Sequence, residues 1–398
     1  MSAPAWVHRL AERLRDPASI VPNAEWHPTS LGDGYPGIGL LFASLAGESP
    51  EWARAAHAHL SAALSAARPS NSECLFVGIP AVAFAARASV RRPGEYAKLL
   101  KAADQRVAAQ AERILAADGL RLRAGTAGVP MAVYDVVSGL SGLGRYLLAC
   151  GPEHEALTER ILMHLVALTR PVDHHGQRAP GWLTPDGQLN LGLAHGIPGP
   201  LALLALAFEM GIRTPGHEQA IRTIVEWILA RQGHDDDGPY WPAAIPLEHE
   251  VHSPSAPLPP TRTAWCYGAP GIARALHLAS RALGESSWCD AACSALESAL
   301  RRPPEQQRLD DTSLCHGGAG LARIVGIIAQ ETGSSALSRA YMHLVSNLIE
   351  QANDESPFIW SHRPGFLEGG VGVALTLLGP PERAPARNLP WEAALLLQ

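Results

Sequence analysis

Several features that mark whole classes of protein are missing from this sequence of 398 residues. No apolar run approaches the roughly 18 uncharged residues of a membrane helix, so we expect no membrane span. The opening MSAPAWVHRLAERLRDPAS lacks the long apolar segment of a secretory signal. The net charge is only -6, both signs are interspersed, and no basic block indicates a nucleic-acid partner. These absences predict a cytoplasmic protein.

Cysteine is also scarce, with six residues in the chain. In a long chain without a secretory signal, such a count indicates reduced thiols and leaves room for a metal site. Cys74 and Cys150 lie in apolar surroundings, and Cys289 and Cys293 stand four apart with no matched histidine or carboxylate. We interpret these four as packing residues, which leaves Cys266 and Cys315 to be explained.

Patterns typical of β-strands are few. GLRLRAG (119–125) and DGQLN (186–190) could form short hairpins at most. Helical periodicity is abundant instead, with apolar side chains recurring along one face of polar stretches. Such amphipathic stretches lie at 50–67, 95–117, 156–170, 218–232, 287–302 and 336–352, and the first residues, 5–14, follow the same pattern.

Between the amphipathic stretches, a glycine motif followed by an apolar run recurs seven times, at intervals of 44 to 72 residues. A recurrence of this size is the mark of a repeat architecture. Each glycine pair would open a helix, because glycine accepts positive φ and lets backbones approach closely. The first glycines of the seven motifs are Gly34, Gly78, Gly139, Gly196, Gly268, Gly317 and Gly369.

Each repeat therefore combines one apolar helix with one amphipathic helix. Apolar helices must be buried on most sides, whereas amphipathic helices need only one partner face. Seven pairs closed in a ring predict an all-α fold, an α/α toroid with seven inner and seven outer helices. An open solenoid would require polar terminal repeats, and the last repeat here is as apolar as the middle ones.

Polar residues just before the motif glycines would line one mouth of this barrel. Cys266 and Cys315 each stand two residues before a first glycine, in consecutive repeats. His316 and His195 each stand one residue before a first glycine, and Asp135 stands four before Gly139. Because neighbouring repeats of a ring are neighbours in space, we expect these five side chains to converge.

Two thiols and an imidazole form a soft ligand set that suits zinc. Three protein ligands leave the fourth tetrahedral position for water or substrate, as in catalytic zinc sites. The sequence therefore predicts one catalytic zinc ion held by Cys266, Cys315 and His316.

The motifs around these residues resemble those of the lanthionine synthetase C-like family, the lanthipeptide cyclases. The resemblance rests on AWCYGAPG, CHGGAG, LGLAHGIPGPLALLALA and VYDVVSGLSGLGRYLL, and covers nearly the whole chain. It implies a single α/α toroid domain over 1–398. Some family members insert an accessory domain, but the 61-residue interval between Gly78 and Gly139 leaves no room for one, so we expect none. No kinase or dehydratase region precedes the toroid, which indicates a stand-alone class I cyclase. The resemblance also implies the same three zinc ligands, and functional roles for Asp135, His195, Arg262 and Tyr267.

The family reaction is addition of a cysteine thiol to dehydroalanine or dehydrobutyrine within one precursor peptide, which forms a lanthionine or methyllanthionine ring. In this scheme His195 acts as general acid and Asp135 orients it. Arg262 stabilises the enolate, and Tyr267 hydrogen-bonds in the same cluster. The resemblance makes the precursor peptide the expected partner. A dehydratase and a transporter would be further members of a biosynthetic complex, which would bring the protein to a membrane through its partners.

Three alternatives stay open. A non-cyclising zinc toroid that adds glutathione to dehydrated peptides, or only binds a partner, would carry a similar site. A glycosidase-like or terpene-cyclase-like barrel would use paired carboxylates, and the mouth acids that the sequence places are Asp33, Asp135 and Glu368. A structural zinc site would need a fourth protein ligand, which His195 could supply.

Overall fold

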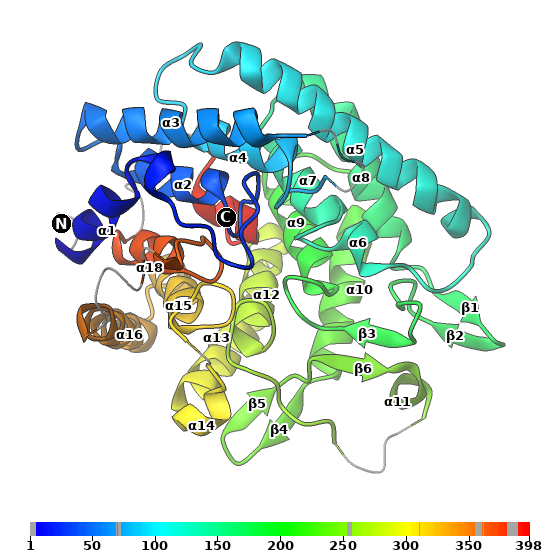
Figure 1. The fold of residues 1–398 in the computed structure, drawn as a ribbon. Helices are drawn as coiled ribbons and strands as arrows, with labels where there is room; N and C mark the ends of the chain where they lie inside the picture. The colour runs from blue at the N-terminus through cyan, green and yellow to red at the C-terminus, as the bar shows by residue number, and fades with distance from the viewer. Residues whose placement is uncertain are drawn as a thin grey trace. The chain divides into compact units, whose positions relative to one another are not determined.

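A computed structural model describes residues 5–68, 70, 73–252, 257–309, 311–354, 360, 362–379 and 389–398. The chain divides into two compact units, which are described separately below. Unit 1 comprises 1–107 and 310–393, and unit 2 comprises 108–309 and 394–398. Helices dominate both units (Figure 1).

The apolar helices begin at the glycine motifs, as the repeat pattern predicts. Six of them start directly after the first glycine of a motif, and α9 starts two residues after it. Nearly every residue of α9 is buried, from Pro198 to Phe208, which is the burial expected of an inner helix. The seven are α2 (Tyr35–Leu45), α4 (Ile79–Ala88), α7 (Leu140–Leu148), α9 (Pro198–Glu209), α12 (Ala269–Leu283), α15 (Gly318–Thr332) and α18 (Gly370–Leu377).

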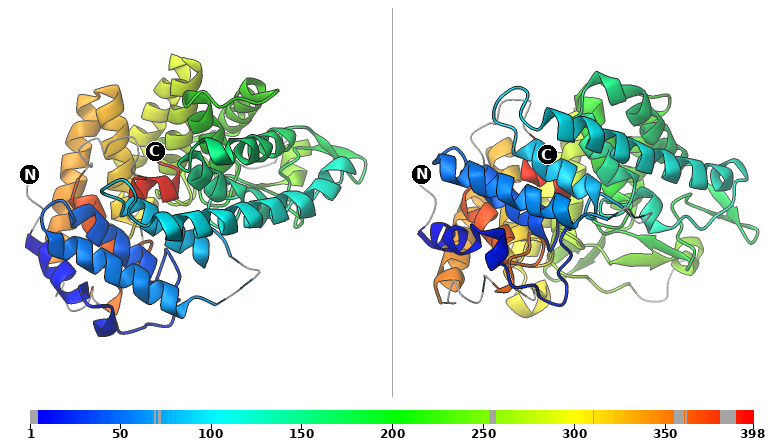
Figure 2. Two further views of the ribbon diagram at one scale, coloured as in Figure 1. Left: turned by 90° about the horizontal axis from the view of Figure 1, so that it is seen from above. Right: turned by 45° about the horizontal axis from the view of Figure 1, so that its top comes forward.

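The amphipathic stretches form a second set of helices, each burying one face. The long α5 fills the 61-residue interval between two motifs and is seen along its length in Figure 2. On α3 the buried face contains Trp52, His59 and Leu60. The set is α1 (Ala5–Leu14), α3 (Pro50–Ala66), α5 (Ala97–Arg123), α8 (Glu155–Ala167), α10 (His217–Ala230), α13 (Ser286–Arg301) and α16 (Ser335–Asp354).

Within unit 1, α2 packs on α3, α4 and α18, while α15 packs on α16 and α18. Within unit 2, α9 packs on α7, α10 and α12, and α12 packs on α13. Apolar helices therefore contact both each other and an amphipathic partner, which is the pairing that the sequence predicts.

Close backbone approach explains the motif glycines more generally than positive φ does. Of the six first glycines that cap a helix, only Gly78 and Gly268 have positive φ, at 88° and 109°. The others are extended, which any residue can adopt. At Gly268 an added Cβ would overlap the Arg262 carbonyl oxygen, and at Gly34 and Gly369 it would also overlap loop carbonyls. The loop before each helix folds tightly onto the helix start.

The C-terminal residues are held by buried arginines in a shared position of the repeat. Arg145 and Arg274 each stand six residues after a first glycine. Their Nε atoms donate to the carbonyl oxygens of Gln398 at 2.6 Å and Leu397 at 2.8 Å. Both arginines and both carbonyls belong to unit 2. In unit 1, Arg323 occupies the same repeat position and forms a buried ion pair with Glu392.

Within the described ranges, short strands form three two-stranded antiparallel sheets, all in unit 2. They are β1 (Val172–His174) with β2 (Gln177–Ala179), β3 (Gln188–Asn190) with β6 (Ala244–Pro246), and β4 (Gly233–Asp235) with β5 (Gly238–Tyr240). The remaining elements are α6 (Met131–Tyr134), α11 (Leu247–Val251), α14 (Pro304–Gln307), η1 (Pro17–Ser19), η2 (Pro152–His154) and η3 (Trp391–Leu395).

The short hairpins that the sequence allowed at 119–125 and 186–190 do not form. Most of 119–125 is the last turn of α5, which runs on to Arg123 because extending an existing helix costs less than starting a strand pair. The segment 186–190 does contain β3, but its partner is the distant β6 rather than a neighbouring segment. Among the described residues, no helix is long and apolar enough to cross a membrane.

Candidate functional site

A histidine and a buried aspartate form the centre of the site in unit 2. His195 lies on the loop between β3 and α9, and Asp135 lies directly after α6. His195 Nδ1 and Asp135 Oδ2 are 2.7 Å apart. The other carboxylate oxygen of Asp135 accepts the backbone N–H groups of Ser138 at 2.6 Å and Gly139 at 2.7 Å. Because both oxygens are engaged and Asp135 is 2% exposed, the carboxylate is held in place.

This contact determines the protonation of the imidazole. Because a carboxylate only accepts hydrogen bonds, Nδ1 of His195 carries a proton and Nε2 is the atom left to exchange one. The hydrogen bond that His195 donates to Asp135 raises the pKa of His195, partly opposed by burial, and the charges of Asp135 and Cys266 raise it further. The side chain of His195 is 38% exposed, so its outer face is accessible. The pair is suited to general acid or base chemistry near neutral pH.

Tyr267 lies beside this pair, and Asn190 holds it. The ring centroids of His195 and Tyr267 are 6.5 Å apart. Asn190 Nδ2 donates to the Tyr267 hydroxyl oxygen at 2.9 Å. The sequence analysis did not identify Asn190. The sequence feature that could have pointed to it is its position at the end of DGQLN, five residues before His195.

The loop that carries His195 packs directly on the loop that carries Cys266 and Tyr267. The Ala194 N–H donates to the Cys266 carbonyl oxygen at 3.4 Å. A Cβ at Gly192 would lie 2.6 Å from the Cys266 carbonyl oxygen and 2.8 Å from the Tyr267 ring. Only glycine therefore permits this packing. Within unit 2 the structure brings Asp135 to His195 and places Cys266 and Tyr267 next to them.

Arg262 precedes α12 on the same loop and is half-buried. Its carbonyl oxygen faces Gly268, and the positive φ of that glycine turns the chain into the helix. The next residue, Thr263, is tied by its N–H to the Gln307 carbonyl oxygen at 2.8 Å. The loop is therefore anchored at Thr263, within the segment that carries Arg262, Cys266 and Tyr267.

Cys315 and His316 lie in unit 1, on the loop that enters α15. The Cys315 N–H donates to the Leu367 carbonyl oxygen at 3.0 Å. The side chains of Cys315 and His316 are half-buried. The His316 ring nitrogens lie 3.6 Å from an Asp311 oxygen and 3.8 Å from a Glu368 oxygen. These separations exceed those of hydrogen bonds, so neither carboxylate fixes the imidazole.

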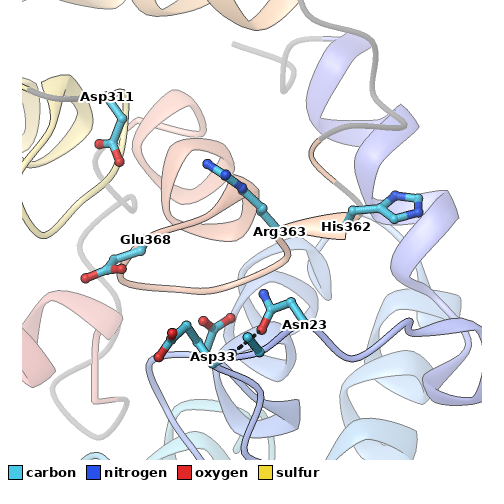
Figure 3. A pocket seen from close by; sticks show the side chains of 8 residues that line it. Asn23, Asp33, Asp311, His362, Arg363 and Glu368 are labelled. Carbon is cyan, nitrogen blue, oxygen red and sulfur yellow. Dashed lines mark hydrogen bonds between the residues drawn. The ribbon is translucent and has the colours of Figure 1, made fainter.

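Asp311 and Glu368 also line an open pocket of about 560 Å³ in unit 1 (Figure 3). The carboxylates of Asp33, Asp311 and Glu368 gather around it, while Arg363 and His362 enter from one segment. Burial raises the pKa of Asp33, and the charges of Glu368 and Glu25 raise it further. The pocket is therefore predominantly anionic. Its lining residues are Asn23, Ala24, Glu25, Asp33, Asp311, His362, Arg363 and Glu368.

Cys266, Cys315 and His316 could each offer one soft ligand atom to a metal. Every cysteine lies in the described part of the chain, and none of the six forms a disulfide. Thiol and imidazole donors fit zinc by chemistry. Because Cys266 belongs to unit 2 and the other two residues to unit 1, the shared ligand set stays a prediction.

The chain is similar to known proteins in both sequence and structure. Residues 25–396 match the family model described as lanthionine synthetase C-like protein. Over 265 residues, 61% of this chain, the sequence is 30% identical to nisin biosynthesis protein NisC of Lactococcus lactis subsp. lactis, and the match spans 60% of that relative's length. The structure resembles that of nisin cyclase with a TM-score of 0.78 at 23% identity, covering 98% of this chain and 95% of the other.

The likeness to nisin cyclase confirms the expected fold class, an all-α protein of the α/α toroid type. The family model covers far more than half of the chain. The chain therefore belongs to the lanthionine synthetase C-like family.

Proposed function

We propose that this protein is a zinc-dependent lanthipeptide cyclase, built as a single toroid domain over 1–398 without an inserted accessory domain. It adds cysteine thiols to dehydroalanine or dehydrobutyrine within one dehydrated precursor peptide and so forms lanthionine or methyllanthionine rings. The observation that carries the proposal is the His195–Asp135 pair, 2.7 Å apart, on a loop packed against the loop of Cys266. Membership of the family supports it.

The proposed zinc ligands are Cys266, Cys315 and His316. Their matched positions before α12 and α15 support the assignment, as does the soft character of the donors. When bound, a zinc ion supplies a Lewis acid that lowers the pKa of a substrate thiol. His195 is not included among the ligands, because the proposed reaction uses its Nε2 lone pair to exchange a proton, and a metal ion on that atom would remove it.

His195 accepts and donates the proton that is transferred in the proposed reaction. The substrate thiol loses its proton and its sulfur bonds to the β-carbon of the dehydro residue. The double-bond electrons move toward the carbonyl as an enolate, and the α-carbon then takes one proton. Nε2 of His195 is the atom that exchanges protons, since Asp135 keeps Nδ1–H in place. The addition releases no atoms, so one imidazole can both accept the thiol proton and return it.

Arg262 and Tyr267 complete the proposed site. A guanidinium stabilises an enolate oxygen by charge and by hydrogen bonds. Arg262 stands four residues before Cys266 on the same anchored loop, which supports that role. Tyr267 lies beside His195 and supplies a further hydrogen-bonding group.

The chemistry of the substrate defines the partners. Dehydrated residues must come from a dehydratase acting earlier, and the precursor peptide itself is the direct partner. A transporter would take the cyclised product, and contact with it would bring the protein to a membrane. Reduced thiols suit the cytoplasm, which we propose as the compartment.

Addition of glutathione to dehydrated peptides, without cyclisation, is the alternative function. The anionic pocket beside His316 favours a cationic ligand over glutathione, which carries two carboxylates. We therefore rank cyclisation first.

The test combines metal content with product analysis. Purified wild type should contain about one zinc per chain by elemental mass spectrometry, and Cys315→Ala should lose it. Incubated with a dehydrated precursor peptide, wild type should consume the peptide's thiols without any change in its mass, since the addition is an isomerisation. Thiol alkylation followed by mass spectrometry measures this.

Cys289→Ala provides the matched control, because Cys289 lies on α13 away from the motif loops. It should keep both zinc and activity. Wild type that contains no zinc and leaves the thiols of the peptide alkylatable would overturn the proposal. Transfer of glutathione in place of ring formation would favour the alternative.

A further inference from the structure

One buried asparagine contacts every segment that carries a proposed proton-handling residue of unit 2. Asn190 ends β3 and is 8% exposed. Its Nδ2 donates to the Tyr267 hydroxyl oxygen at 2.9 Å and to the Met131 sulfur at 3.4 Å. Met131 begins α6, the short helix that leads to Asp135. The Asn190 carbonyl oxygen accepts the Ile197 N–H at 3.1 Å and so closes the loop that holds His195.

The orientation of the Asn190 amide follows from one backbone group. Its Oδ1 accepts the Gly192 N–H at 2.8 Å. A backbone N–H can only donate, so the oxygen of the amide must face Gly192 and the nitrogen must face Tyr267. The two side-chain N–H groups and the oxygen then all have hydrogen-bond partners, and rotating the amide would break these hydrogen bonds.

This orientation fixes the direction of the hydrogen bond to Tyr267. The amide nitrogen is a donor only, so the Tyr267 oxygen accepts from it. The hydroxyl proton of Tyr267 must therefore point away from Asn190. A tyrosine oxygen that accepts from a fixed amide leaves its own proton for another acceptor, and such a donor would stabilise an oxygen that gains negative charge during reaction.

We infer that Asn190 is a positioning residue of the site, whose amide holds the Tyr267 hydroxyl as a hydrogen-bond donor toward the reacting peptide. This inference rests on the proposed cyclase function. Asn190 acts through Tyr267 and touches neither substrate nor metal. Its other bonds, to Gly192 and Ile197, hold the His195 loop in place.

Asn190→Asp reverses one hydrogen bond with little change in shape. One oxygen of the new carboxylate still accepts the Gly192 N–H. The other can only accept, so the Tyr267 proton turns toward it and is withdrawn from the site. Loss of one such hydrogen bond in the transition state should lower kcat about tenfold with little change in KM.

A double-variant comparison distinguishes this role from a merely structural one. If Asn190 acts through Tyr267, then Tyr267→Phe combined with Asn190→Asp should cyclise no more slowly than Tyr267→Phe alone. Losses that multiply in the double variant would overturn the inference. So would an Asn190→Asp enzyme with wild-type kcat.

A spectroscopic readout makes the result independent of activity. The chain has seven tyrosines, and carbon-13 labelling at their ring Cζ atoms gives signals sensitive to hydrogen bonding. Tyr267→Phe identifies the signal of Tyr267 by its loss. The chemical shift of the Tyr267 Cζ signal should change in Asn190→Asp. It should not change in Met131→Leu, which removes only the sulfur acceptor of Asn190.

The two readouts separate the two proposals. An unmoved Tyr267 signal in Asn190→Asp, in a variant whose circular dichroism and melting match wild type, would overturn the inference whatever the activity. A wild-type protein that forms no rings would overturn the cyclase function, while a moved signal would still support the hydrogen-bond direction. If Asn190→Asp does not fold, Asn190→Ser offers a smaller side chain for the same measurements, with the Tyr267 signal again expected to move.

Discussion

Two histidines occupy the same position of the repeat, yet their surroundings differ. His195 and His316 each directly precede the first glycine of a motif. His195 is bound through Nδ1 to the buried Asp135 at 2.7 Å. His316 is held more loosely, because oxygens of the exposed Asp311 and Glu368 lie 3.6 Å and 3.8 Å from its ring nitrogens. The first imidazole is fixed and made more basic, whereas the second keeps its ring nitrogens available to other partners.

This difference supports the proposal that one repeat position supplies two chemistries. A proton-transfer group needs a held tautomer and a pKa near the working pH. A metal ligand needs a neutral ring with an accessible lone pair, and a strongly bound carboxylate on both sides would hinder it. The repeat provides the position of each histidine, and the surroundings of each are consistent with the role proposed for it.

The sharpest test of the comparison is to remove each histidine and measure zinc. His316→Ala should lose the metal and all detectable cyclisation, because one of three proposed ligands is gone. His195→Ala should keep about one zinc per chain. Elemental mass spectrometry of the two variants gives the answer. If His195→Ala loses the metal instead, the roles of the two histidines must be exchanged.

His195→Ala should nevertheless be a poor catalyst. General acid or base catalysis by a positioned side chain contributes about 10²–10⁴-fold, and we expect a loss of that order in the cyclisation rate. Quenched time courses with thiol alkylation measure it. His217→Gln is a suitable control, because His217 is buried on α10 and bonds only a helix carbonyl. A wild-type rate in His195→Ala would remove this residue from the mechanism.

Asp135→Asn should convert His195 into a histidine more like His316. The main causes that raise the pKa of His195 are the hydrogen bond and charge of Asp135, so that pKa should fall in the variant. The limb of the pH–rate profile that reports His195 should move to lower pH. We expect a loss in rate of about 10–100-fold with zinc retained. A profile that does not move would mean that another group controls it.

The same variant should change the pH dependence of stability. The pKa of His195 is raised in the folded protein above its usual 6.5, so folding favours the protonated form. The stability this contributes is fully present below pH about 6.5 and is lost as the pH rises through the folded-state pKa. Asp135→Asn should therefore lower the melting temperature more at pH 5 than at pH 9. Equal losses at both pH values would contradict this linkage.

The smallest effect should come from the acids beside His316. The Glu368 side chain is 54% exposed and lies 3.8 Å from the imidazole. Exposed pairs of this kind contribute about 0–1 kcal/mol, so Glu368→Gln should change the cyclisation rate by less than about fivefold. A loss as large as that of Asp135→Asn would mean that Glu368 acts on His316 as Asp135 acts on His195, and the contrast between the two histidines would fail.

Part of the site was readable from the sequence because it depends on position along the repeat. Counting back from the motif glycines gives the repeat positions of Cys266, Cys315, His195 and His316. Six helices begin directly after those glycines, as predicted. Asp135 was predicted to meet His195 by the same counting, and the two are in contact. The cysteine and histidine ligand set stays a prediction.

Asn190 could not be found in this way. It belongs to β3, which pairs with the distant β6, and it contacts Tyr267 across 77 positions of the chain. No repeat position predicts such a contact. Of the acids in the anionic pocket, the sequence placed Asp33 and Glu368 at the mouth by their repeat positions but did not place Asp311.

The sequence by itself determined the all-α class, the number of repeats and the residues that enter each apolar helix, because local periodicity and glycine spacing encode them. Only the tertiary structure decided which way the amide of Asn190 faces, and that Arg145 and Arg274 hold the carbonyls of the last residues. Those features depend on hydrogen-bond partners far apart in the chain. A buried polar group is satisfied by whatever donor or acceptor the fold brings to it, and that choice is made when the helices pack.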